Sequence, residues 1–314
     1  MRLTTRLILL ALIAVIPAIL IQTYSLFEIS RSREAEVRDD ALRQAQLASS
    51  EIDRVLEGIR NLLVAISTAN SVRRLDTATC SPFLVRLEAR VPHLDSIAVM
   101  DSDGGLRCAS VSTGAGLTFS DRSYFQAAIE GRDFVVGEYT INRFDQRKVL
   151  PLAVPVTNDD GGVIGVVSAT LDLAWISREL LARGIPAGGS VTLADRNGVI
   201  LARAPQPEAF VGTRIPDAFM HLVSAPEPGA LDLTSQDGTR RILGYVPAAY
   251  QRQGLYVSAG LSAEQAFAAI REATLRSAIL LALALVGTVI LGLVAGRLFI
   301  KRPVGRLLQA ARAW

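Results

Sequence analysis

The stretch VTLADRNGV at residues 191–199 decides the fold, because it repeats the stretch IAVMDSDGG at residues 97–105. Two shorter landmarks recur downstream in the same order: Val154-Pro155 returns as Val246-Pro247, and Val167-Ser168-Ala169 returns as Val257-Ser258-Ala259. The three offsets are 94, 92 and 90 residues, so the spacing between landmarks is almost constant. Apolar segments separated by Asp-Gly turns at such a spacing indicate two tandem copies of one module of helices and strands. The expected fold class is α+β.

The first copy contains the clearer strand pattern. Residues 96–100 and 106–110 predict a hairpin around a turn of Asp and Gly residues, and a short helix follows Asp121. Three apolar segments then predict strands over 134–142, 149–157 and 163–171, and residues 172–183 predict a connecting helix. The Gly-rich stretch 184–189 marks the boundary to the second copy.

A long helix precedes both copies. Its apolar residues alternate in steps of four and three, at Ala41, Ala45, Ala48, Ile52, Val55, Ile59, Leu62 and Ile66. Such a heptad seam predicts packing against a partner helix, and therefore a homodimer. Packing of the same helix on its own domain is the alternative, and the two arrangements are compatible along different lengths.

Two apolar segments explain the mean hydropathy of +0.33 over 314 residues. Residues 7–27 and 274–300 each predict a transmembrane helix, because each is close to the roughly 20 residues that cross a bilayer. Arg2 and Arg6 precede the first segment, and Lys301 and Arg302 follow the second. By the positive-inside rule, both termini are cytoplasmic and the region between the spans lies outside. A cleaved signal peptide is the alternative for the first segment.

The only two cysteines, Cys80 and Cys108, lie in this external region. In an oxidising compartment an even pair favours a disulfide, and two unpaired thiols are the alternative. No metal site is expected, because neither cysteine has a His or a third Cys near it in sequence.

Arg122 and the aromatic pair Tyr124-Phe125 are the candidate binding residues. They stand at the start of the short helix, where a cation and an aromatic ring facing a sheet suit a small anion. A surface ion pair of Arg122 with Asp121 or Glu130 is the alternative. The polar segment 143–148 is expected to be a solvated hairpin tip.

The second copy lacks this motif. Its corresponding segment, 211–216, holds Arg214 with no aromatic residue beside it. If only one module binds a ligand, the first is therefore expected to do so.

Several classes of function are disfavoured by the residues. The net charge is only +3 and the basic residues are scattered, which argues against a nucleic-acid partner. No nucleophile, base and acid stand in a recognisable catalytic context, so an enzyme within this chain is not expected. No phosphate-binding loop or other cofactor motif occurs, and no cofactor is expected.

The layout of span, long helix, two modules and second span resembles the double Cache sensor region of bacterial transmembrane receptors, with PAS-like modules. The stretch Arg302-Pro303-Val304 resembles the start of a HAMP linker. The boundaries expected from this resemblance are a cytoplasmic N-terminus 1–6, a first span 7–27, a stalk or dimerisation helix 28–70, a membrane-distal module 71–183, a membrane-proximal module 184–273, a second span 274–300 and a linker start 301–314.

The resemblance implies that Arg122 and Tyr124 bind a ligand carboxylate and that Phe125 and Tyr139 form pocket walls. Cache domains that recognise amino acids carry an Asp near the end of the last strand, where this chain has Thr170, with Asp172 two residues on. Asp172 would lie roughly 7 Å further along a strand. A carboxylate or another small polar ligand is therefore favoured over an α-amino acid.

The expected protein is a dimeric two-pass receptor of the bacterial inner membrane with a periplasmic sensor. It would signal through the linker to a histidine kinase, a diguanylate cyclase or a chemotaxis output, as part of this polypeptide or as a separate protein. The main alternative is a membrane-anchored module that binds another protein and no small ligand. A membrane-anchored enzyme is the least favoured alternative.

Overall fold

The computed structural model describes residues 3–112, 116–130, 133–182 and 184–295. The chain divides into two compact units, one of residues 1–36 with 264–314 and one of residues 37–263. Helix α1 (Leu3–Ser67) contributes to both units, and α9 (Ala268–Ala295) belongs to the first. Among the residues that could be searched, no helix has the length and apolar character needed to cross a membrane. The spans predicted at 7–27 and 274–300 stay predictions, and the predicted linker start 301–314 lies outside the described residues.

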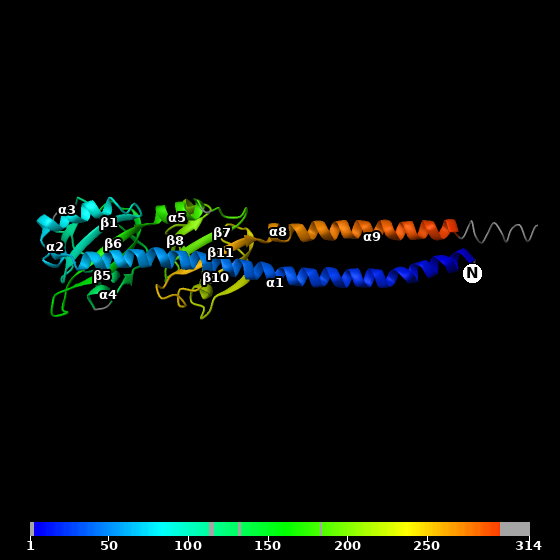
Figure 1. Ribbon diagram of the computed structural model, residues 1–314, viewed down its shortest axis with the longest axis horizontal. Coiled ribbons are helices and arrows are strands. Elements are labelled where there is room, and N and C mark those ends of the chain that lie inside the picture. Colours follow the sequence, from blue (N-terminus) through cyan, green and yellow to red (C-terminus); the bar gives the residue numbers. More distant parts are fainter. Residues whose placement is uncertain (1–2, 113–115, 131–132, 183, 296–314) are drawn as a thin grey trace, which may run out of the picture. The chain divides into compact units, whose positions relative to one another are not determined.

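Residues 37–263 form two modules, each with one antiparallel sheet (Figure 1). The distal module contains α2 (Asn70–Arg73), α3 (Thr77–Glu88), β1 (Leu94–Asp101), β2 (Leu106–Ala109), α4 (Ser123–Ile129), β3 (Val135–Val136), β4 (Thr140–Ile141), β5 (Lys148–Thr157), β6 (Val163–Asp172) and α5 (Leu173–Ala182). Its sheet has the order β2-β1-β6-β5-β3, with β4 also paired to β5.

The proximal module contains β7 (Ser190–Ala194), β8 (Ile200–Ala204), α6 (Pro207–Phe210), η1 (Asp217–Phe219), α7 (Met220–Val223), β9 (Gly229–Thr234), β10 (Arg240–Val246) and β11 (Tyr256–Ser262). After β11, α8 (Ala263–Ala266) belongs to the first unit except for Ala263. The sheet order of the proximal module is β8-β7-β11-β10-β9, the same path as in the distal module. The predicted α+β class and the two tandem modules are therefore confirmed.

The repeat extends to individual strand pairs. Ala98 of β1 pairs with Ser168 of β6, and the residues 94 and 90 positions later, Thr192 and Ser258, pair in the proximal sheet. Pro151 pairs with Thr170, and Leu243, 92 residues after Pro151, pairs with Gly260. The register is conserved between the modules, so side chains at matching positions point to the same face of each sheet.

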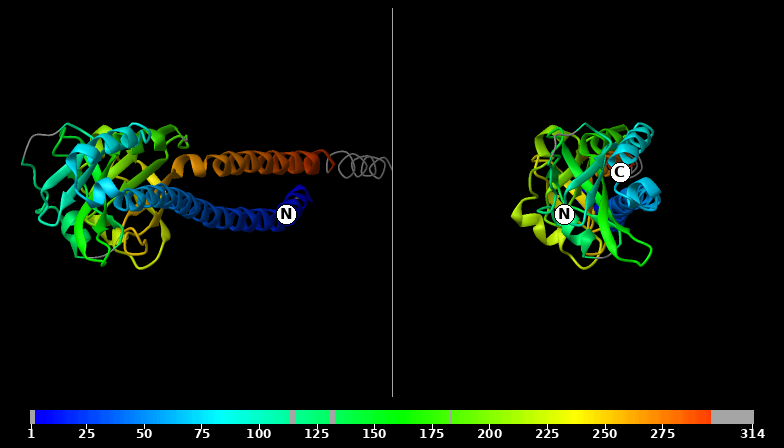
Figure 2. Two further views of the ribbon diagram at one scale, coloured as in Figure 1. Left: turned by 60° about the vertical axis from the view of Figure 1, so that its left-hand side comes forward. Right: turned by 90° about the vertical axis from the view of Figure 1, so that its left-hand side faces the viewer.

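Alternation along the strands gives each sheet two different faces. On the distal sheet, Val99, Leu152 and Val167 pack with residues of α1 and α3 in the largest buried cluster. Met100 and Ala153, their neighbours along the chain, pack with α4 on the other face. Figure 2 shows α1 and α3 beside each other on one side of the module. The helices on one face leave the opposite face available for a binding site.

Small residues let α1 approach the proximal sheet closely. Ala41 and Ala45 are fully buried, and a Cβ built on Gly244 of β10 would overlap the backbone of Ala41 and Leu42. Only Gly at this position allows the helix to lie on the sheet at this distance. The same face of α1 continues along the distal sheet with Leu56, Ile59, Leu63 and Ile66, which are all buried.

The predicted heptad seam is thus divided. Half of its residues, Ala41, Ala45, Ile59 and Ile66, are buried within the chain's own unit. The other half, Ala48, Ile52, Val55 and Leu62, are only partly buried. The pattern follows the domain core because the core spans both sheets and therefore sets most of the helix's apolar periodicity.

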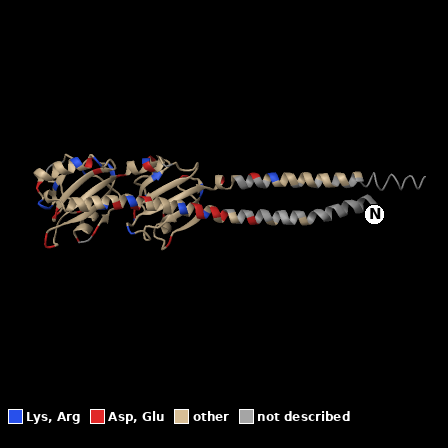
Figure 3. Ribbon diagram, viewed as in Figure 1, with Lys and Arg blue, Asp and Glu red and all other residues tan. Residues whose placement is uncertain are grey.

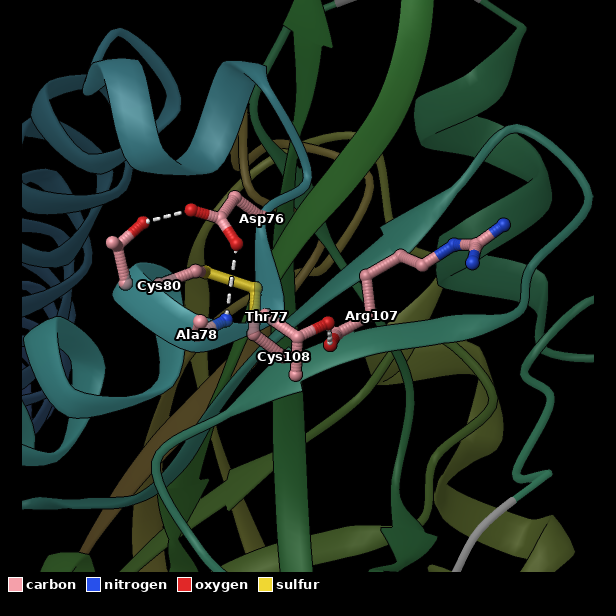
Figure 4. The surroundings of a disulfide bond; sticks show 7 residues. Asp76, Thr77, Ala78, Cys80, Arg107 and Cys108 are labelled. Atoms are coloured by element: carbon pink, nitrogen blue, oxygen red, sulfur yellow. Dashed lines mark hydrogen bonds between the residues drawn. A yellow bond between two sulfur atoms is a disulfide. The ribbon is translucent and has the colours of Figure 1, made fainter.

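Cys80 of α3 and Cys108 of β2 form a disulfide with a Cα–Cα distance of 5.9 Å (Figure 4). Asp76 caps α3 by accepting hydrogen bonds from the Ala78 N–H and the Thr79 hydroxyl. Thr77 donates a hydrogen bond of 2.8 Å to the Arg107 carbonyl oxygen. These contacts attach the start of α3 to the edge strand β2.

The strand predicted over 134–142 is interrupted, which corrects that prediction. Residues 135–136 form β3 and residues 140–141 form β4, and the Gly137 N–H still donates to the Pro151 carbonyl oxygen of β5 at 2.9 Å, whereas residues 138–139 belong to no strand. A Cβ on Gly137 would lie 2.7 Å from Pro151 Cγ, and the Tyr139 N–H donates to Asp195 of the proximal module instead of to β5. A contact between modules replaces part of the sheet pairing.

We predict opposite effects for two glycine substitutions. Gly58→Ala, at a helical site with no atom within 4 Å of the new Cβ, should raise the free energy of unfolding by about 0.5–1 kcal/mol. Gly244→Ala should lower it by about 1–3 kcal/mol, because α1 must move away from the sheet. Urea denaturation of the full chain in detergent micelles measures both. Equal effects of the two substitutions would contradict the close contact of α1 with β10.

Candidate functional site

A small hollow of about 20 Å³ lies over the face of the distal sheet opposite to α1. The polar residues around it are Ser96, Arg122, Tyr124, Thr140, Asn142, Arg143, Ser168 and Thr170. Ala98, Phe119, Ile141, Phe144, Val149 and Pro151 complete the lining. A volume of this size holds only one or two water molecules.

The floor of the hollow consists of hydroxyl groups from paired strands. Ser96 of β1 lies opposite Thr170 of β6, and their hydroxyl oxygens are 2.8 Å apart in a buried hydrogen bond. Ser168, two residues before Thr170, reaches the same face because side chains alternate along a strand. The floor therefore offers hydrogen-bonding groups within an otherwise apolar sheet.

Arg122 is the N-cap residue of α4 and is half-buried beside this floor. Its Nη1 donates to the Thr140 hydroxyl at 2.5 Å, and its Nη2 donates to the Ile141 carbonyl oxygen at 3.4 Å. Both acceptors are neutral, and no ion pair of Arg122 occurs within the described ranges. Its positive charge remains uncompensated by a carboxylate at contact distance.

Tyr124 presents a buried phenol to the same hollow. Burial raises the pKa of Tyr124 to about 12, while the charges of Arg122 and Arg143 and a hydrogen bond with Ser168 act in the opposite direction. The phenol is neutral at physiological pH. It can therefore donate a hydrogen bond to an anion.

Arg143 closes one side of the hollow. It donates to the Thr118 carbonyl oxygen and, at 2.5 Å, to the Asp121 carboxylate, and its guanidinium carbon lies 5.3 Å from the centre of the Phe119 ring. Its hydrogen bond with Asp121 lowers the pKa of that carboxyl group. The prediction that 143–148 is a solvated tip is wrong for Arg143, whose side chain is 27% exposed. Its contacts with the Phe119 ring and the Asp121 carboxylate hold the Arg143 side chain against the module.

A buried acid lies behind Asn142. The Asn142 amide nitrogen donates to Asp95 Oδ2 at 2.5 Å, and Arg147 Nη1 donates to Asp95 Oδ1 at 2.8 Å. Burial raises the pKa of Asp95, while its contacts with Asn142 and Arg147 lower it. Asp95 thus fixes the amide of Asn142 at the wall of the hollow.

No group of three or more His, Cys, Asp or Glu residues in the part of the chain that the structure describes could hold a metal ion. The hollow instead combines a cation, a phenol, hydroxyls and an amide. This set is suited to a small oxygen-rich anion and supplies no nucleophile with a base beside it.

The profile of the Cache domain family matches residues 29–270. The chain belongs to the Cache domain family. This match spans both modules and most of the long helix, and it confirms the expected resemblance to the sensor regions of receptors. No curated protein sequence matches the chain significantly.

Several solved structures share the fold of this Cache domain. The extracellular domain of rpHK1S-Z16, assigned as a histidine kinase, has 24% identity and a TM-score of 0.64 over 75% of this chain and 96% of its own. The ligand-binding domain of the Pseudomonas fluorescens chemoreceptor CtaA, in complex with L-isoleucine, has 18% identity and a TM-score of 0.62 over 77% and 99%. The sensor domain of the V. cholerae histidine kinase DctB has 13% identity and a TM-score of 0.56 over 74% and 98%.

Three of the six predicted binding residues, Arg122, Tyr124 and Thr170, line the hollow of the Cache domain. The other three lie elsewhere. Phe125 packs in the core under α4, because adjacent helical residues face different directions. The Tyr139 hydroxyl lies against Gly212 of the proximal module, since residues 138–139 lie between β3 and β4 and belong to no strand. Asp172 accepts a hydrogen bond from the Ala174 N–H and pairs with Arg178 at 3.6 Å.

Five polar residues of the hollow were missed by the sequence analysis: Ser96, Thr140, Asn142, Arg143 and Ser168. Ser168 and Thr170 alternate with apolar residues inside a strand that is otherwise buried on both faces. That spacing is a readable signal of a polar patch on one face. Asn142 and Arg143 carry no such signal, because a turn brings them back over the sheet.

We predict that alkaline pH destabilises the protein through its buried phenols. The pKa of Tyr124 is raised to about 12, so above pH 10 the unfolded chain loses this proton before the folded chain does. The free energy of unfolding should therefore fall between pH 10 and 12, by about 2–3 kcal/mol for this group.

In Tyr124→Phe the decline should be shallower by that amount, as measured by urea denaturation at each pH. Tyr250→Phe, at a residue that is 60% exposed, is the matched control and should follow the unmodified protein. The same slope in all three proteins would rule out a buried, neutral Tyr124.

Proposed function

We propose that this chain is the ligand-sensing region of a membrane receptor and that the distal hollow binds a small carboxylate. The observation that carries the proposal is the position of Arg122, whose guanidinium borders the hollow with neutral acceptors only. A carboxylate would give this cation a charge-assisted, bidentate partner. Tyr124 and the hydroxyl floor would complete its hydrogen bonds.

Ligand size implies a conformational change. The hollow of about 20 Å³ is too small for an organic acid, and its cover is formed by residues 140–144. A ligand carboxylate would replace Thr140 and Ile141 as the partner of Arg122 and displace the covering segment outward. Binding would then favour an open arrangement of the 137–144 segment over the closed one.

A carboxylate without an amino group is favoured within this proposal. Thr170 takes the place expected of an ammonium-binding acid, and Asp172 is engaged with α5. CtaA is described in complex with L-isoleucine, L-leucine, L-alanine and L-serine, and Mlp24 with asparagine. If this chain also bound an amino acid, Asp95 would be the nearest buried carboxylate to serve the amino group, through the displacement of Asn142.

We predict that a carboxylate raises the melting temperature of the full chain and that Arg122→Ala removes this effect. Thermal unfolding in detergent micelles would be measured against matched pairs of acids with and without an α-amino group, such as propionate and alanine. Loss of the guanidinium should weaken binding about 30-fold or more, because a buried charge pair is lost.

The control is Arg240→Ala, which removes an exposed arginine paired with Asp232 on β9 and should leave binding unchanged. The absence of any stabilising compound in a broad panel would favour the alternative, a module that binds another protein. Binding that persists in Arg122→Ala would place the ligand elsewhere.

The route of the signal is proposed to pass through the segment that covers the hollow. The Tyr139 N–H donates to Asp195 at 2.9 Å, and the Val136 carbonyl oxygen accepts from Arg196 at 3.0 Å. Lys148, after the same segment, donates to the Val211 carbonyl oxygen at 2.7 Å. Movement of the cover would therefore pull on the β7–β8 turn of the proximal module.

We predict that Arg196→Ala uncouples the modules without loss of ligand affinity. On addition of the most stabilising acid, hydrogen exchange of amides 195–199 should change in the unmodified protein and stay constant in Arg196→Ala. Exchange in 137–144 should respond in both. Equal responses of the turn in both proteins would contradict this route.

The proposal further includes a homodimer and a two-pass topology. A groove of about 940 Å³ runs between α1 and α5, and Leu47, which is 66% exposed, lies at its edge with the partly buried seam residues Ala48, Ile52 and Val55. The apolar character of this groove supports the packing of a second copy. The output would be a histidine kinase, a diguanylate cyclase or a chemotaxis protein, reached through a linker that begins at 301–314.

A further inference from the structure

The proximal module has a hollow of its own, of about 40 Å³, over the corresponding face of its sheet. Ser190, Thr192 and Ser258 contribute polar groups to it. Ser190 and Thr192 stand 94 residues after Ser96 and Ala98, and Ser258 stands 90 residues after Ser168. Because the strand register is the same in both sheets, three floor positions of one hollow are reproduced in the other.

The cation of this second hollow comes from a strand. Arg203 of β8 pairs with Thr192 in the sheet and lines the hollow with a side chain that is only 4% exposed. Its Nη1 donates to the Thr192 hydroxyl at 3.0 Å and its Nη2 to Asp237 Oδ2 at 3.0 Å. The ring of Phe210 lies 4.3 Å from its guanidinium carbon. Arg203 thus occupies the role that Arg122 has in the distal hollow, from a different element.

One donor of Arg203 is left without an acceptor. Its Nε atom is buried, and it has no hydrogen-bond partner among the described residues. A buried donor without a partner destabilises the folded state, and more so when the group is charged. Such a donor at the wall of a hollow indicates a missing acceptor.

Arg203 and a second buried arginine, Arg241, have one carboxylate between them among the described residues. Arg241, which is buried, donates from Nη1 to Asp237 Oδ1 at 2.6 Å, so Arg203 and Arg241 share one carboxylate. Burial tends to raise the pKa of Asp237, but the hydrogen bond from Arg241, that from the Thr239 N–H and both positive charges hold it well below its usual range. Asp237 is therefore fully ionised at physiological pH. Two guanidinium groups against one carboxylate leave one positive charge in a poorly hydrated site.

We propose that the proximal hollow binds a small monovalent anion, of the size of formate, acetate or chloride, between Arg203 and the hydroxyls of Ser190 and Ser258. The volume fits about three water-sized groups and excludes larger acids. The anion accepts from the Nε–H of Arg203 and neutralises the remaining charge. This site is separate from the distal hollow and does not depend on its ligand.

The experiment uses the full chain in detergent micelles with Arg122→Ala as background, which disables the distal site. Sodium formate and, separately, sodium chloride replace sodium gluconate at constant ionic strength, because gluconate is too large for the hollow. The melting temperature should rise with saturation, by roughly 5–10 °C at a hundredfold excess over the dissociation constant. A response to formate alone identifies a carboxylate site, and responses to both ions identify a general site for small anions.

Two variants address the site itself, each in the same background. Arg203→Gln removes the cation, and Leu233→Trp fills the hollow while Arg203 and Asp237 stay in place. Both should abolish the rise. Arg240→Gln, at an exposed arginine of β10, is the matched control and should keep it.

A rise that persists unchanged in both site variants would overturn the proposal, and so would the absence of a saturable rise in Arg122→Ala. A rise that occurs in the unmodified protein but is absent in Arg122→Ala would place the ion in the distal hollow, against this inference but in agreement with the proposed function. A rise in Arg122→Ala without any stabilising organic acid for the distal hollow would support this inference and count against the proposed function.

Discussion

The packing of α1 along both sheets is the constraint on which residues 37–263 depend. Ala41 meets Gly244 and Ala45 packs with Val246 in the proximal module, and Leu56, Ile59 and Leu63 enter the core of the distal module. Because one helix covers the same face of each sheet, the largest buried cluster lies on that face, and the opposite faces carry smaller buried clusters. Those opposite faces can carry hydroxyls and arginines that would be costly inside the largest cluster.

The face opposite to α1 has a similar hollow in both modules. Each has a floor of Ser or Thr side chains, in which Ser190 and Ser258 match Ser96 and Ser168 in register. In each, an arginine that donates to a threonine hydroxyl stands at the wall: Arg122 in the distal hollow and Arg203 in the proximal one. The two arginines differ in their surroundings. Arg122 is half-buried with neutral acceptors, whereas Arg203 is almost fully buried and shares Asp237 with Arg241. Lys and Arg residues are interspersed with Asp and Glu residues along the ribbon of both modules (Figure 3).

The link between modules depends on an interruption of sheet pairing. The Gly137 N–H donates to the Pro151 carbonyl oxygen of β5, whereas the Tyr139 N–H donates to Asp195, so segment 137–139 is bonded to both modules. Asp195 also accepts from the Asn197 and Val199 N–H groups of its own turn. The backbone of the distal module is therefore linked directly to the β7–β8 turn of the proximal module, through hydrogen bonds at Tyr139 and Val136.

The sequence by itself determined the repeat, the α+β class and the long helix, because these follow from residue periodicity and from spacing along the chain. It also singled out Arg122 and Tyr124, whose types and position are local features. Only the tertiary structure decided that Tyr139 faces the proximal module, that Arg143 covers the distal hollow and that Arg203, rather than Arg214, lines the hollow of the second copy. Those placements depend on contacts between strands and turns far apart in sequence. Contacts of this kind cannot be predicted from the periodicity of residues in a single sequence.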